Sequence, residues 1–268
     1  MAGFESGTEQ LLCHLQDRVA IITLNRPEAR NALSNELTSA LRRAIAWAID
    51  EADVGAVLLT GAGGAFCSGG DVKAMANRNA DNNTAVSTEI QFQQMRARHH
   101  EIAGALRAMR KPSIAALPGP AAGAGMAIAL ACDLRIASNS AFLSTAYARI
   151  GLTGDYGIAW LLTRVVGPGR ARQLMLTAER VTADQALAMG LINQIATDES
   201  LAADAFTLAR QLAHGPQSAY AYIKDNLDEA LTIDHATAID READRLLKAR
   251  TTPAHKEAVR AFAEKRLQ

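Results

Sequence analysis

Two glycine-rich stretches hold the residues best suited to chemistry. The first, GAGGAFCSGGDV at 61–72, has five glycines after a short apolar strand. In the second, KPSIAALPGPAAGAGMAIALACDLRIAS at 111–138, Gly119, Gly123 and Gly125 lie where a loop enters an all-apolar helix. Glycine leaves no side chain between the backbone and a ligand, and the first N–H groups of a helix have no intrahelical acceptor. These amides can therefore bind developing negative charge, although a buried helix packed closely through Ala and Gly gives the same pattern.

The surrounding sequence must position these loops, and it alternates strands with helices. Apolar runs bounded by turn residues predict strands over 9–14, 19–24, 54–60, 113–117, from about 133, 141–144 and 191–195. Helical patterns cover 34–53, 90–110, 122–131, 158–166 and 182–189, and four more cover 199–213, 217–231, 234–249 and 253–267. We therefore predict an α/β core over 1–199 and a helical region over 200–268 that serves assembly and covers a site.

Composition excludes several classes of protein. Lys plus Arg equals Asp plus Glu at 28 each, which argues against a nucleic acid or an acidic membrane as the main partner. Three scattered cysteines are too few for a disulfide framework or a CxxC metal site and suit a reducing compartment. No leader or apolar span of membrane length is visible, so we expect a cytoplasmic protein.

Two resemblances to nucleotide enzymes are weak. Gly61-x-Gly63 begins like a dinucleotide fingerprint, but Phe66 stands where the third glycine would be, and the following stretch 77–88 is a polar loop. Tyr220 and Lys224 have the spacing of a reductase pair without a nucleotide loop before them. The adjacent His99 and His100 point in two directions on a helix, which predicts a solvated face and no metal site.

Five motifs together resemble the crotonase (enoyl-CoA hydratase/isomerase) superfamily over nearly the whole chain. They are the two glycine-rich stretches, RPEARNALS at 26–34, IGLTGDYGIAWLLTRVVG at 150–167 and AVRAFAEKR at 258–266. The resemblance implies a crotonase-like spiral of ββα units with a C-terminal helical trimerisation region. It also implies an acyl-CoA thioester as substrate and a homotrimer or a dimer of trimers, with no metal and no cofactor beyond the CoA of the substrate.

The resemblance also implies how the thioester is held. The N–H groups of Gly70 and Ala124 would form the oxyanion hole for the thioester carbonyl. The matching CoA positions are Arg30 near the phosphates, Ala32 and Leu33 along the pantetheine, and Ser68, Asp71, Val72, Phe262 and Lys265. Plainer roles are a surface charge for Arg30, a helix N-cap for Asp71 and a core anchor for Phe262.

The acid/base residues depart from the hydratase pattern. Hydratases of this family use two glutamates, and the matching positions here are Ala127 and, at or beside the second, Tyr147. Asp155 is the remaining carboxylate, as in the single-aspartate, ring-isomerising epoxyphenylacetyl-CoA isomerase branch. A lone carboxylate beside an oxyanion hole favours a double-bond shift, because hydration needs a second polar group to hold water.

Alternatives remain for both residues and for the function. Asp155 could instead be the N-cap of the helix at 158–166, and Tyr147 could be an aromatic side chain packed under a loop. The protein could also be an unusual or weak enoyl-CoA hydratase in which Asp155 and Tyr147 share the water, a CoA-thioester hydrolase, or a non-catalytic acyl-CoA-binding protein.

Overall fold

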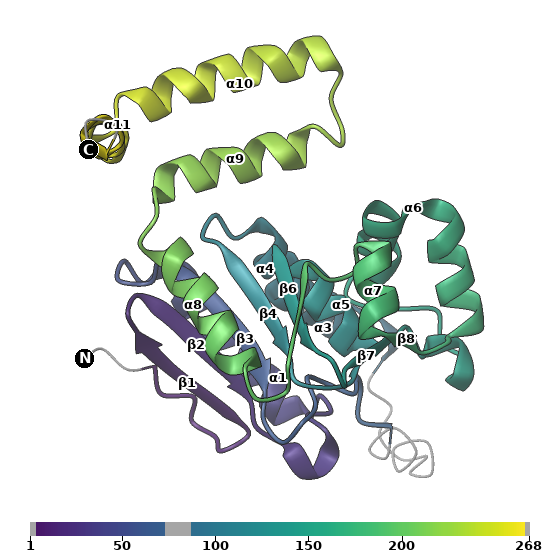
Figure 1. The fold of residues 1–268 in the computed structure, drawn as a ribbon. Helices are drawn as coiled ribbons and strands as arrows, with labels where there is room; N and C mark the ends of the chain where they lie inside the picture. Colours follow the sequence, from purple (N-terminus) through teal and green to yellow (C-terminus); the bar gives the residue numbers. More distant parts are fainter. Residues whose placement is uncertain (1–3, 73–86, 266–268) are drawn as a thin grey trace.

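The structure is a computed structural model that describes residues 4–72 and 87–265 (Figure 1). Most of the polar stretch 77–88, predicted as a loop, lies outside the described residues. The main sheet has the strand order β1-β2-β3-β4-β6-β9. Its strands are β1 Leu11–Gln16, β2 Val19–Leu24, β3 Ala56–Gly61, β4 Ser113–Leu117, β6 Leu134–Ser138 and β9 Gln194–Ala196. β1 and β2 form an antiparallel hairpin, and the other neighbouring strands are parallel.

A second, three-stranded sheet contains β5 Ala121–Ala122, β7 Phe142–Ser144 and β8 Val181–Thr182. The chain visits the two sheets in turn and then forms a helix. β4 and β5 precede α5 Ala124–Ala131, and β6 and β7 precede α6 Ile158–Thr177. This repetition is the strand–strand–helix unit that the sequence predicts. Each unit delivers the loop after its main-sheet strand to the same edge of the sheet.

The main sheet is covered on both faces, because its central strands are nearly continuous apolar runs whose successive side chains point to opposite faces. Ala20 and Ile22 of β2 pack in the larger cluster, with α1 Asn35–Asp50 and α5. Val19 packs in the smaller cluster on the other face, with α8 Leu201–Ala213. The predicted division at residue 199 assigns α8 to the C-terminal region, whereas its buried alanines pack it onto the core.

The helix predicted over 90–110 is interrupted. It consists of α3 Thr88–His99, a π-helical turn at His100–Gly104 and α4 Ala105–Ala108. A π-helical turn inserts an extra residue into the helix and often marks a functional site. The turn packs against α1 and α5, so the C-terminal end of α3 lies beside the helix that leaves the second glycine-rich loop.

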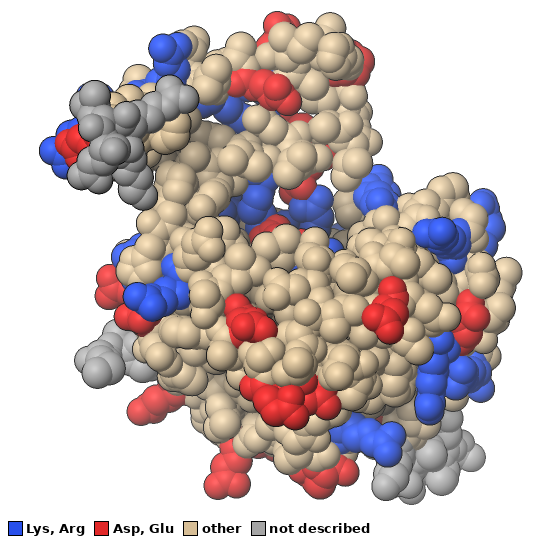
Figure 2. Space-filling view, in the orientation of Figure 1, with Lys and Arg blue, Asp and Glu red and all other residues tan. Residues whose placement is uncertain are grey.

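The remaining helices are α7 Ala183–Met189, α9 Gln217–Glu229, α10 His235–Arg250 and α11 Pro253–Lys265. Figure 1 shows α9 and α10 side by side above the core, and Figure 2 shows a hollow between them and the core with charged side chains in it. Ion pairs such as Lys224–Asp133 at 2.7 Å join α9 to the core. Arg245 of α10 donates to Asn226 at 2.7 Å and so ties α10 to α9. Exposed apolar residues of α9, α10, α11 and the turn after α9 are Ile223, Leu227, Leu231, Ile239, Leu246, Leu247, Val259 and Phe262. Within the described residues, every helix is too short or too polar to cross a membrane.

Candidate active site

The two glycine-rich loops meet along a backbone seam. They follow β3 and β4, which are neighbouring parallel strands, so both loops emerge at the same edge of the sheet. Cys67 pairs with Ala121 as an isolated parallel bridge. The N–H of Ala122 donates to the carbonyl of Cys67 at 2.9 Å, and the N–H of Cys67 donates to the carbonyl of Pro120 at 3.1 Å. The relative position of the loops is therefore fixed by main-chain hydrogen bonds.

The seam is so close that it requires glycine. A Cβ on Gly125 would lie 2.2 Å from the carbonyl oxygen of Cys67, and one on Gly69 would lie 2.8 Å from the carbonyl oxygen of Ala122. Gly69 also has φ = 95°, a conformation that residues with a side chain rarely adopt. The glycines identified in the sequence thus serve the approach of one loop to the other.

The predicted oxyanion donors lie on the two sides of this seam. Ala124 is the first residue of α5, so its N–H has no acceptor within the helix. Its nitrogen is 3.4 Å from the position that a Cβ on Gly69 would occupy. Gly70, the next residue, bridges to Leu33, whose N–H donates to the carbonyl of Gly69 at 2.8 Å. The arrangement brings Gly70 and Ala124 to one place, and their role as an oxyanion hole stays a prediction.

Tyr147 and Asp155 form a hydrogen-bonded pair beside the seam. The Tyr147 hydroxyl donates to Oδ1 of Asp155 at 2.5 Å. Tyr147 is buried at the start of the short 3-10 helix η3 Tyr147–Ile150, and its Cε1 lies 3.9 Å from the Cβ position of Gly123, the residue before α5. The pair therefore lies where the second glycine-rich loop enters its helix. Its two polar groups are as close together as the hydratase alternative, in which they share a water, requires.

Burial governs the protonation of this pair. It raises the pKa of the Asp155 carboxyl, and the hydrogen bond from Tyr147 opposes that rise. Burial, followed by the nearby Asp155 charge, raises the pKa of the Tyr147 phenol far above its ordinary value. Tyr147 is consequently a proton donor at neutral pH, and Asp155 accepts a proton more readily than an exposed aspartate does.

The structure contradicts the plainer role of Asp155 as a helix cap and agrees with that of Tyr147 as a packed aromatic side chain. The N-cap of α6 is Gly157, without a side-chain cap hydrogen bond, so the N-cap interpretation of Asp155 is wrong. The reason is that Tyr156 and Gly157 are both left-handed and separate Asp155 from the helix by a turn. Tyr147 does pack as a buried aromatic residue, but its hydroxyl also serves Asp155.

Three neighbours of this pair were not singled out as site residues from the sequence. Cys67 is fully buried, and burial raises its pKa to about 12, so its thiol is neutral. The His99 and Tyr156 rings are in contact, with centroids 4.3 Å apart. The predicted solvated face is therefore wrong for His99, which is half-buried, with a pKa lowered chiefly by burial. The sequence signal for its burial was the position of His99 three residues before the buried Ile102, which puts both on one face of a helix.

The predicted CoA residues fall into two groups. Near the seam, the carbonyl of Arg30 accepts from the N–H of Ser68 at 3.0 Å, which places the exposed Arg30 next to Ser68. Ala32 and Leu33 follow directly along the same segment, and the Ser68 hydroxyl donates to the carbonyl of Ala29 at 3.3 Å. The structure therefore brings Arg30, Ala32, Leu33 and Ser68 together along one side of the first glycine-rich loop.

The other CoA candidates, Asp71, Val72, Phe262 and Lys265, do not all lie near the seam. Asp71 is 3.4 Å from the guanidinium of Arg26, and the Val72 side chain is half-exposed. Phe262 and Lys265 belong to α11, which Figure 1 shows well away from α5. Phe262 is 61% exposed, so the core-anchor interpretation is wrong. In a single chain these two residues do not reach the seam.

The described residues contain no cluster of three His, Cys, Asp or Glu side chains able to hold a metal ion. Ala127, which the resemblance matches to the first glutamate of hydratases, is fully buried within α5 and presents only a methyl group. Fold and site together define an α/β protein in which two glycine-rich loops present backbone N–H groups beside a hydrogen-bonded tyrosine–aspartate pair.

Known proteins are similar to this chain in sequence and in fold. The model of the enoyl-CoA hydratase/isomerase family matches residues 14–268. The 1,2-epoxyphenylacetyl-CoA isomerase of Escherichia coli (strain K12) is 36% identical over 258 residues, which are 96% of this chain and 97% of that protein. The short-chain-enoyl-CoA hydratase of Clostridium acetobutylicum is 32% identical over 252 residues, 94% and 93% of the two chains.

The fold is also similar to that of a solved enoyl-CoA hydratase. The crystal structure of an enoyl-CoA hydratase from Polaromonas sp. JS666 superimposes with a TM-score of 0.87 at 30% identity and covers 95% of this chain and 97% of that one. This protein therefore belongs to the enoyl-CoA hydratase/isomerase family, whose members act on acyl-CoA thioesters. The family and the crotonase-like fold predicted from the sequence are confirmed.

Proposed function

We propose that this protein shifts a carbon–carbon double bond in an enoyl-CoA thioester, with Asp155 as the acid/base group. The observation that carries the proposal is the partly buried hydrogen bond between Tyr147 and Asp155 beside the seam. It provides one carboxylate of raised pKa within an apolar site, next to N–H groups suited to an enolate oxygen.

In the proposed reaction, the thioester oxygen of a 3-enoyl-CoA accepts hydrogen bonds from the N–H groups of Gly70 and Ala124. The Asp155 carboxylate takes a proton from carbon 2, and the electron pair of the broken C–H bond delocalises onto the thioester oxygen. The protonated Asp155 then gives its proton to carbon 4, and the double bond ends between carbons 2 and 3. Each fixed donor contributes about 3 kcal/mol to stabilising the enolate-like transition state.

The raised pKa of Asp155 suits this cycle, because an acid/base group works best when its pKa lies near the working pH. Tyr147 holds the carboxylate in one orientation through its hydroxyl and remains protonated throughout. The neutral Cys67 thiol adds no competing charge.

Hydration is the second candidate. Tyr147 supplies a second polar atom beside Asp155, and the Clostridium relative is named a hydratase. Against hydration, the methyl group of Ala127 cannot hold or deprotonate water. We therefore rank the double-bond shift first.

We further propose that the C-terminal helices join copies of this chain into a trimer or a dimer of trimers. The exposed apolar side chains along these helices support this, because burying them would remove large apolar area from water. In such an assembly, Phe262 and Lys265 of one copy could cover the CoA bound to another, while Arg30 and Ser68 bind the CoA from their own copy. Light scattering of the full chain at several concentrations measures the number of copies.

The test is incubation of the full chain with 3-enoyl-CoA and 2-enoyl-CoA thioesters of several lengths in deuterated water. Product mass reports deuterium uptake and hydration, and fragmentation reports the position of the double bond. The reaction is compared with Asp155→Asn and with Asp53→Asn, which changes an exposed loop aspartate. Calorimetry with CoA alone checks that each variant still binds.

A moved double bond is expected, slowed about 100- to 10,000-fold by Asp155→Asn and unchanged by Asp53→Asn. Deuterium enters carbon 4 only in turnovers in which the protonated Asp155 exchanges with solvent before it gives up its proton. A 3-hydroxyacyl-CoA product would favour hydration, and free CoA would favour hydrolysis. Binding of CoA without any product from this substrate series would refute the double-bond shift and leave an acyl-CoA-binding protein.

A further inference from the structure

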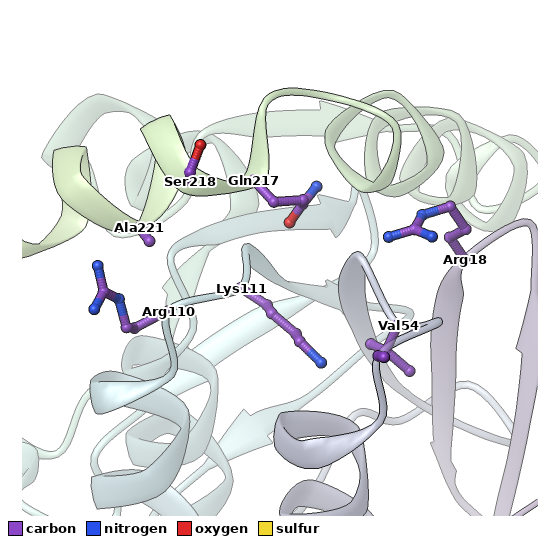
Figure 3. Close-up of a pocket in the computed structure, with 8 residues that line it drawn as sticks. Arg18, Val54, Arg110, Lys111, Gln217, Ser218 and Ala221 are labelled. Carbon is purple, nitrogen blue, oxygen red and sulfur yellow. The ribbon is translucent and has the colours of Figure 1, made fainter. Parts of the chain in front are cut away.

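A cavity lies at the end of the main sheet opposite to the glycine-rich loops. Its volume is about 330 Å³, and its lining includes Arg18, immediately before β2, and Lys111, two residues before β4 (Figure 3). The glycine-rich loops follow the carboxyl ends of the parallel strands, whereas this cavity lies at their amino ends. The strands themselves therefore separate the cavity from the proposed acyl-CoA site.

All charged side chains that line the cavity are cationic, namely Arg18, Lys111 and Arg110. Arg110 is neutralised, because its guanidinium lies 2.9 Å from the Asp225 carboxylate. Figure 3 shows Arg18 reaching from one side toward Gln217, with Lys111 between Arg110 and Val54. Two cations of the core thus face this space without a paired carboxylate lining it.

The hydrogen bonds of these two cations leave donors free. Arg18 donates only through Nε, to the carbonyl of Ala213 at 3.4 Å, and its terminal nitrogens contact no acceptor within residues 4–72 and 87–265. Lys111 donates to the carbonyls of Ala48 and Glu51 at 2.9 and 2.6 Å, which leaves one of its three N–H groups. Neither carbonyl removes the positive charge.

The two cations also act on each other. Burial lowers the pKa of Lys111, and the charge of Arg18 lowers it in the same direction, whereas Glu51 and Asp50 oppose the change. Glu51 and Asp50 act on Lys111 more strongly than Arg18 does, so the repulsion between the two cations is the smallest of these effects. A ligand that carries negative charge would offset this repulsion.

The C-terminal region adds neutral donors to the same space. Ser218 lines the cavity as the second residue of α9, and its N–H has no intrahelical acceptor, whereas its hydroxyl points away from Lys111 in Figure 3. The side-chain amide of Gln217 donates instead to carbonyls at the end of α8, including that of Leu212 at 2.8 Å. Donors from the core and from α9 therefore converge on one cavity.

We propose that this cavity binds a phosphate group, either inorganic phosphate or that of a phosphate monoester, between Arg18 and Lys111. A phosphate has enough acceptor oxygens to take hydrogen bonds from both cations and from Ser218 at once. Its binding would add to the ion pairs Arg110–Asp225 and Lys224–Asp133, which already join α9 to the core. The proposal is independent of the reaction at the acyl-CoA site.

The test is calorimetric titration of the full chain with inorganic phosphate and, separately, with phenyl phosphate as a simple monoester. The buffer contains no phosphate, and sodium chloride keeps the ionic strength constant. Arg18→Gln removes the cation with free donors and spares Lys111, whose bonds support the end of α1. Arg210→Gln is the matched control, because Arg210 is exposed and pairs with Asp17 outside the cavity. Circular dichroism checks that both variants fold.

Saturable binding is expected for the native chain, at least about tenfold weaker in Arg18→Gln and within about twofold of native in Arg210→Gln. Loss with both probes would assign the site to the phosphate group itself, and loss with phenyl phosphate alone would assign it to a monoester. The proposal would be overturned if the native chain and Arg18→Gln bind phosphate equally well. It would also be overturned if the native chain shows no more saturable heat with phosphate than with sodium chloride at the same ionic strength.

Discussion

Replacing Gly125 by alanine tests whether the seam between the two loops sets the catalytic geometry. The new Cβ would lie 2.2 Å from the carbonyl oxygen of Cys67, where ordinary van der Waals contact begins at 3.4 Å. The obstruction is backbone and cannot rotate away, so the first loop and α5 must separate by about 1 Å. Gly70 and Ala124 belong to the two separating segments and would no longer converge on one oxygen.

The expected magnitude follows from that displacement. A misplacement of about 1 Å in a catalytic constellation can cost about 100-fold in rate, so kcat should fall about 100-fold while free CoA still binds. Overpacking should also lower the free energy of unfolding by about 1–3 kcal/mol, partly offset by the better helix propensity of alanine.

The assay measures kcat and KM for an enoyl-CoA turned over by the native chain, together with urea unfolding of both proteins. Gly169→Ala is the matched control, because a Cβ there meets nothing within 4 Å and its φ is not in the positive region. That variant should keep kcat and unfold at the same or slightly higher urea concentration. A folded Gly125→Ala protein with native kcat and native stability would refute the reasoning that the seam positions the amides.

Three further predictions concern single side chains or donors. Tyr147→Phe removes the hydrogen bond that lowers the pKa of Asp155, so the pKa of Asp155 should rise. Because the base must be ionised, the acid limb of the kcat/KM profile should move to higher pH. An acid limb that stays in place would show that Tyr147 does not act on the catalytic base. Ala124→Pro removes one N–H at the first helical position, where proline is tolerated, and should lower kcat about 100- to 1,000-fold without unfolding the chain; steady-state kinetics with thermal unfolding decides this. Thr182→Ala breaks the capping box with Gln185 and should lower the free energy of unfolding by about 1 kcal/mol with kcat unchanged, as measured by urea unfolding.

Elements with a local signal were predictable from the sequence. The strands at 19–24 and 113–117 are observed with those bounds, because apolar runs between turn residues define them. The capping of α7 by Thr182 was likewise visible in its residue types. Both glycine-rich loops were recognised because glycine is required wherever two backbones come this close.

What depends on contacts between distant segments was not predictable. The π-helical turn after His99 leaves no mark in local periodicity, and the contact of His99 with Tyr156 depends on how α3 meets the segment before α6. The mistaken cap at Asp155 has the same origin. Ala146 and Tyr156 adopt left-handed conformations that their residue types disfavour, so the turns that bring Tyr147 to Asp155 cannot be read from the sequence.

The seam has a consequence for how this chain can change its chemistry. Its candidate charge-binding groups are main-chain N–H groups, which every residue except proline provides, whereas the acid/base groups are side chains that one substitution can replace. In the proposed reaction, mutation at Tyr147, Asp155 or Ala127 would therefore redirect the fate of the enolate while the loops that hold it stay in place. The part of the site that is hard to alter would bind a feature shared by all thioesters, and the part that is easy to alter would decide which product forms.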